Sequence, residues 1–260
     1  MLLVCGLLFL QQPSLVAERV AVRRTEGVVH GFLVLRTLDG KTLADGDLIQ
    51  VPRGGQMTTR LTFRFKDGSI HEESAVYSQR RYFRLLSSRL VQKGPTFPRS
   101  LDMSVEATKG HVRVRYTEED GEEKVEDEQL DLPADLANGL ILTLVKNLPP
   151  DGRPATVSLI AATPKPRVVT LEISAQGREP FVTGRTPRKA VHYVVKVDIG
   201  GVAGIVAPLI GKEPPDSHVW VLGGEAPAFI KAELPLYPGG PMWRIELVSP
   251  AWPRAAPQTQ

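Results

Sequence analysis

Histidine and acidic side chains are the groups of this chain that could bind a metal ion or transfer protons. Their densest cluster is His71-Glu72-Glu73, and in an extended strand His71 and Glu73 point to one face while Glu72 points to the other. Two ligands on one face form an incomplete metal site, so we favour a solvated strand edge. The sequence predicts no metal site and no cofactor, because no H-x-H or H-E-x-x-H spacing occurs among its histidines (His30, His71, His111, His192 and His218).

Nucleophilic catalysis has no recognisable signature in the sequence. Ser69 follows Gly68 but lacks the second glycine of a G-x-S-x-G elbow. Cys5 is the only cysteine, which excludes an intrachain disulfide, and an apolar run is a poor setting for a reactive thiol. Paired-carboxylate chemistry stays open, because such carboxylates meet only in the folded chain. We therefore assign no catalytic residue.

Residues 197–216, VDIGGVAGIVAPLIGKEPPD, form a glycine-rich and almost uncharged segment. It does not match a phosphate loop, because Val206 stands where the first glycine belongs and Glu213 where the hydroxyl residue belongs. Pro208 also removes an amide donor. Three interpretations stay open: a buried turn between strands, an apolar flap over a cavity, and a loop that touches a membrane surface.

Basic side chains gather at residues 79–91, QRRYFRLLSSRLV, where arginines alternate with Tyr82 and Phe83. This pattern suits phosphates or anionic lipid head groups. We favour a solvated strand of mixed charge that pairs with the acidic residues 122–128. The 32 basic and 29 acidic residues leave a net charge of only +3, which argues against a nucleic acid partner.

The first ten residues, MLLVCGLLFL, are apolar but too few to span a bilayer, which takes about 20. They match the apolar core of a secretory signal peptide. The whole signal peptide would comprise residues 1–17 and be cleaved after Ala17. No Lys or Arg precedes the run, and Leu15 stands where a small residue is usual, so a buried first strand is the alternative. The signal peptide predicts export to the periplasm or cell envelope.

Most of the secondary structure that the sequence predicts around these groups is β-strand. Hairpin turns are indicated at Asp39-Gly40, Asp67-Gly68 and Asp120-Gly121. The alternation of Val112, Val114 and Tyr116 with polar residues indicates a strand with one buried face. Six further strands are predicted after residue 150, at residues 156–161, 167–173, 191–199, 218–222, 228–233 and 243–248.

One segment has helical periodicity. Over residues 135–148 the apolar side chains recur at the spacing of an amphipathic helix, and Pro149-Pro150 ends it. We predict an α+β fold, mostly β, in which a strongly curved, half-barrel-like antiparallel sheet packs around this helix. Residues 18–249 would form this single β-rich domain, and residues 250–260 a flexible tail.

Several strings together resemble an uncharacterised family of exported bacterial β-rich proteins. They are FRFKDGSI (63–70), QKGPTFP (92–98), PKPRV (164–168), GGVAGIVAPLIGKEPPD (200–216) and WRIELV (243–248). The resemblance implies no activity and no catalytic residues. The layout is also distantly similar to half-barrel envelope proteins that carry lipids or lipoproteins.

The leading hypothesis is a non-catalytic envelope protein that binds a lipid or another apolar small molecule in the half-barrel. The candidate cavity-wall residues are Leu140, Leu144, Val202, Ile205, Val206, Leu209 and Ile210. One alternative is an envelope hydrolase that uses carboxylates with His192 or His218. Another is a non-catalytic assembly module with an exposed apolar patch.

Overall fold

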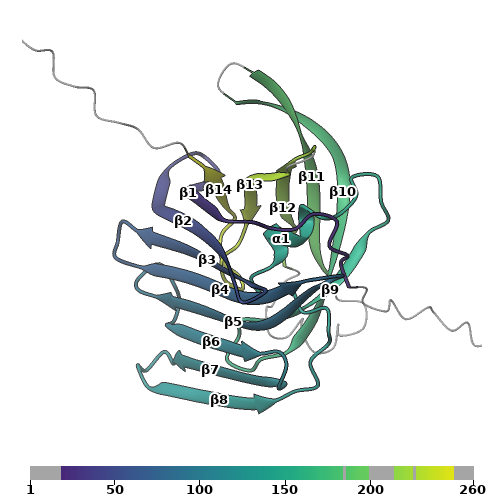
Figure 1. Ribbon diagram of the computed structural model, residues 1–260. Coiled ribbons are helices and arrows are strands. Elements are labelled where there is room, and N and C mark those ends of the chain that lie inside the picture. Colours follow the sequence, from purple (N-terminus) through teal and green to yellow (C-terminus); the bar gives the residue numbers. More distant parts are fainter. Residues whose placement is uncertain (1–18, 184–185, 199–213, 225–226, 249–260) are drawn as a thin grey trace, which may run out of the picture.

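The described part of the chain forms one antiparallel sheet of fourteen strands (Figure 1). The computed structural model describes residues 19–183, 186–198, 214–224 and 227–248. The strands are β1 (Val29–Thr37), β2 (Thr42–Arg53), β3 (Gln56–Phe65), β4 (Ile70–Gln79), β5 (Phe83–Lys93), β6 (Leu101–Glu106), β7 (His111–Thr117), β8 (Glu123–Gln129), β9 (Ala155–Ile160), β10 (Val168–Thr183), β11 (Thr186–Asp198), β12 (Ser217–Leu222), β13 (Ala228–Leu234) and β14 (Trp243–Leu247).

The first and last strands pair at the middle of the sheet. β1 pairs with β14, and from this pair the sheet extends through β2 to β8 on one side and through β13 to β9 on the other. The sheet is strongly curved, and among the described strands it is not closed, because β8 and β9 each have one neighbour. Segments far apart in sequence therefore face each other across the concave side. The predicted curved antiparallel sheet is confirmed.

Asp-Gly turns connect the strands where the sequence predicts them. Gly40, Gly68 and Gly121 have φ angles of 96°, 85° and 87° and lie in the turns after β1, β3 and β7. Side chains rarely adopt these angles, so glycine is favoured there. The alternating burial of β6 and β7 places Val112, Val114 and other apolar residues on the concave face, where the core lies.

The helix is much shorter than the sequence predicts. Helix α1 covers Ile141–Val145 rather than residues 135–148. The preceding residues pair with β9 instead: the Ala137 backbone N–H donates to the Ser158 carbonyl at 2.8 Å, and Leu136 forms a parallel bridge with Ser158. Gly139, with φ of +70°, then turns the chain into the helix. Within the described ranges of the chain, no helix is long and apolar enough to cross a bilayer.

Two predictions about charged strands are wrong because they depended on the strand order. β5 pairs with β4 and β6, so the basic strand does not contact the acidic β8, and Arg89 instead binds Asp102 of β6 at 2.7 Å. His71 and Glu73 do not lie at a solvated edge, because β4 lies between β3 and β5 and His71 is only 4% exposed.

Candidate functional site

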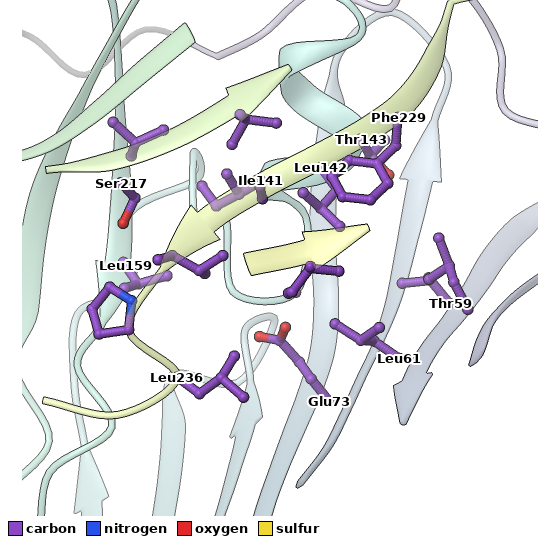
Figure 2. A pocket seen from close by; sticks show the side chains of 18 of the residues that line it. Thr59, Leu61, Glu73, Ile141, Leu142, Thr143, Leu159, Ser217, Phe229 and Leu236 are labelled. Atoms are coloured by element: carbon purple, nitrogen blue, oxygen red, sulfur yellow. The ribbon is translucent and has the colours of Figure 1, made fainter. Parts of the chain in front are cut away.

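A cavity of about 310 Å³ lies on the concave face, between α1 and the two halves of the sheet. In Figure 2, Leu61 and Phe229 extend into this space from opposite halves, and Ile141 and Leu142 reach it from the helix. Most of the other lining side chains are also apolar. The curvature of the sheet creates the site, since Leu61 and Phe229 are 168 residues apart in sequence and lie on strands that do not pair.

The described wall candidates lie next to the residues that line the cavity. Leu140 and Leu144 are buried in the core, with 1% and 3% exposure, whereas Ile141 and Leu142 are among the lining residues. The other candidates, Val202, Ile205, Val206, Leu209 and Ile210, lie outside the described residues. The nearest described lining residues on either side of them in sequence are Val197 and Pro215.

Glu73 places a carboxyl group in this apolar space. Its cross-strand neighbours are Leu61 on β3 and Leu90 on β5, and all three side chains line the cavity. Figure 2 shows the carboxyl group pointing into the cavity. Burial raises the pKa of Glu73, because the charged form loses hydration, and a hydrogen bond from the backbone of Gly139 partly opposes this shift.

His71 is held neutral beside Glu73. Burial lowers its pKa from 6.5 to about 4. The Gln92 side-chain nitrogen donates to the Leu236 carbonyl at 2.6 Å and lies 3.1 Å from Nδ1 of His71. Because the Leu236 carbonyl requires a donor, the Gln92 amide orientation is fixed and Nδ1 acts as the acceptor. The neutral ring therefore carries its proton on Nε2.

A buried ion pair forms another part of the cavity wall. Lys146, just after α1, lines the cavity, and its Nζ lies 2.5 Å from Oε2 of Glu26. The two side chains are only 13% and 9% exposed. Gln50 donates to the same Glu26 oxygen at 3.0 Å and accepts from the Tyr77 hydroxyl at 3.2 Å. The positive charge of Lys146 is thus balanced within the protein, by a residue 120 positions away in sequence.

A separate acid–base group lies on the opposite, convex face. Val195 and Val197 of β11 line the cavity, so His192 points to the other side of the same strand. Nδ1 of His192 lies 2.9 Å from Oε1 of Glu179, and its Nε2 lies 3.0 Å from Nδ1 of His218. The ring of His192 stacks on Trp220 at 4.4 Å between centroids. A histidine and a carboxylate do meet, but away from the cavity.

Three carboxylates approach one another on the hairpin between β7 and β8. Glu118, Asp120 and Glu122 bring oxygen atoms within 4.8 Å of each other. The ammonium group of Lys124 lies 2.9 Å from Glu118 and 3.6 Å from Glu122. The cluster is therefore already neutralised in part by the protein, as is usual for a solvated hairpin.

Comparison with known proteins supports the fold and goes no further. No family model and no curated protein matches the chain. A crystal structure that is similar to it is that of a β-barrel-like protein of the domain of unknown function DUF1849 from Brucella abortus. The TM-score is 0.50 at 11% sequence identity, over 86% of this chain and 98% of the other. The likeness supports the expected resemblance to uncharacterised β-rich proteins; export and similarity to lipid carriers stay predictions.

Proposed function

We propose that this chain is a non-catalytic protein of the cell envelope that binds an apolar or amphipathic ligand in the concave cavity. The observation that carries the proposal is the cavity itself, about 310 Å³ in volume and lined mostly by aliphatic side chains. Ligand sites typically have volumes from about 300 Å³ upward, apolar walls and a few polar groups. Glu73 and Lys146 would be such polar groups.

The energetics also favour an occupant. The cavity is partly open, so its apolar walls contact water when no ligand is bound. A hydrocarbon chain placed there would contribute about 25 cal/mol per Å² of apolar surface removed from water.

Export is the second part of the proposal. It is supported by the apolar run of residues 1–10, which has the length of a signal peptide core rather than of a membrane span. Expression of the full chain followed by cell fractionation and mass spectrometry of its N-terminus tests it. Processing after Ala17 and recovery from the envelope fraction are expected; an uncleaved protein in the cytoplasm would refute this part.

Ligand binding is tested by uptake of a neutral fluorescent naphthylamine dye by delipidated protein. We expect saturable uptake in the wild type and at least tenfold weaker uptake in Leu142→Trp, because the larger ring would fill the cavity. Leu38→Trp is the matched control, since Leu38 is 46% exposed in the turn after β1. Absence of dye uptake by the wild type, together with absence of lipid in native mass spectra, would end the proposal.

A hydrolase is the second candidate, favoured by the convergence of Glu179, His192 and His218. In it His192 would act as the general base, oriented by Glu179. Turnover of a panel of ester and glycoside substrates by the wild type, lost in His192→Gln, would support this candidate. If the wild type hydrolyses none of the panel, the candidate is rejected.

A further inference from the structure

We propose that the ligand of this cavity carries a hydrogen-bond-donating head group, an ammonium or a hydroxyl, that binds the carboxylate of Glu73, and that the cavity discriminates against anionic lipids. This inference rests on the proposed function and names the chemical class of its ligand. It starts from the position of Glu73 among apolar neighbours in the middle of the cavity wall. Acidic side chains are rarely enclosed in this way without a partner of opposite charge.

The charges that line the cavity do not balance. Among the described lining residues, the ionisable side chains are those of His71, Glu73 and Lys146. Lys146 is paired with Glu26 at 2.5 Å, and His71 is neutral at physiological pH. Among the described residues, the influences on the pKa of Glu73 are burial, which raises it, and the Gly139 backbone, which lowers it; no described cation contributes. The described wall therefore presents one uncompensated negative charge when Glu73 is ionised.

One side of the Glu73 carboxyl group is already organised by the protein. Gly139 can approach β4 closely because it has no side chain: a Cβ atom there would lie 2.9 Å from the Cβ of Ala75. This approach allows the Gly139 backbone to hydrogen-bond with Glu73. A carboxylate has about four acceptor positions, so a single N–H leaves most of them free. Figure 2 shows the group directed into the cavity, where a ligand could supply further donors.

The sign of the head group follows from this arrangement. A ligand ammonium would give Glu73 the opposite charge that its surroundings lack, in a medium of low dielectric where the pairing is stronger than in water. A ligand hydroxyl would donate without adding charge. A ligand carboxylate would place two like charges in one apolar space, so that one of the groups would have to bind a proton. Anionic amphiphiles should therefore bind weakly at a pH where both groups would be ionised.

The test compares three twelve-carbon amphiphiles that differ only in the head group. Dodecylammonium, dodecanol and dodecanoate compete at pH 8 with the neutral naphthylamine dye on the full, delipidated chain. We expect dodecylammonium to bind at least tenfold more tightly than dodecanoate, with dodecanol between them. In Glu73→Gln the ratio of the dodecylammonium affinity to the dodecanoate affinity should fall below about threefold while the dye still binds, because this variant removes the charge and keeps the shape.

Glu72→Gln is the matched control, because Glu72 adjoins Glu73 in sequence but points to the opposite face of β4 and is not among the lining residues. It changes the net charge equally and should keep the wild-type ratio. Equal binding of dodecanoate and dodecylammonium to the wild type would overturn the inference, as would an unchanged ratio of their affinities in Glu73→Gln. In either case, uptake of the dye by the wild type would still support the proposed function. If neither the dye nor any amphiphile binds, the proposed function fails instead. If Glu73→Gln does not fold, the ratio of the two affinities in the wild type still tests the inference.

Discussion

Gly139 lies so close to Ala75 that a Cβ atom on the glycine would fall 2.9 Å from the Cβ of the alanine. The contact joins the turn before α1 to β4, in the middle of the N-terminal half of the sheet. Gly139 lies two residues before Ile141, the first residue of α1, and the contact brings the Gly139 backbone to Glu73. The close approach at Gly139 thus links the turn before the helix to the carboxyl group in the cavity wall.

Replacing Gly139 by Ala should destabilise the protein through two effects. The φ angle of +70° is unfavourable for alanine by roughly 1–2 kcal/mol, and the close contact with Ala75 adds about 1–3 kcal/mol of overpacking. Gly239→Ala is the control, since its φ is +74° and a Cβ there meets nothing within 4 Å. Urea unfolding should show a larger loss for Gly139→Ala than for Gly239→Ala; equal losses would mean that the Ala75 contact is unimportant.

The buried pair of Lys146 and Glu26 predicts a strong double-mutant coupling. Lys146→Met leaves the Glu26 carboxylate buried without its cation, which should cost about 3–5 kcal/mol of unfolding free energy. Adding Glu26→Gln should recover much of this loss, because the orphaned charge is then removed. As a comparison, Arg64→Met breaks a pair with Asp47 in which the Arg64 side chain is 67% exposed, and the change should stay below about 1 kcal/mol. Similar losses in Lys146→Met and Arg64→Met would show that burial does not matter here.

Local features of this fold could be predicted from the sequence, and long-range ones could not. The Asp-Gly turns and the alternation of Val112, Val114 and Tyr116 follow from neighbours in sequence, and the structure has both. Apolar residues do recur at helical spacing over residues 135–148, but this local pattern could not reveal that Leu136 pairs with Ser158 and therefore lies outside the helix. Tertiary pairing overrides local helix preference at that point.

The candidate site shows the same division. Alternation correctly placed His71 and Glu73 on one face of a strand, yet only the order of strands reveals that this face is the concave one. The pairing of Glu26 with Lys146 spans 120 residues and has no local signal.

Asn138 should be essential for anchoring the turn before α1 to β9. Its side-chain amide donates to the Ile160 carbonyl and accepts from the Ile160 backbone N–H, both at 2.9 Å. In Asn138→Leu the buried backbone groups of Ile160 lose these partners, which should cost roughly 2–4 kcal/mol. The measurement is chemical unfolding combined with hydrogen exchange of the Ile160 amide. Wild-type exchange protection at Ile160 in this variant would contradict the assigned role.

His71 should make the protein less stable as the pH falls below neutrality. Its pKa is lowered by burial from 6.5 to about 4, so between these values the unfolded chain binds a proton that the folded chain does not. The stability associated with neutral His71 is complete above about pH 6.5, decreases on acidification and is lost by about pH 4, for a total of about 3 kcal/mol. His71→Gln removes this titration. From pH 7.5 to pH 4 the wild type should therefore lose about 3 kcal/mol of unfolding free energy relative to His71→Gln. A difference between the two proteins that does not depend on pH would contradict this expectation, as would an NMR titration of His71 near pH 6.5.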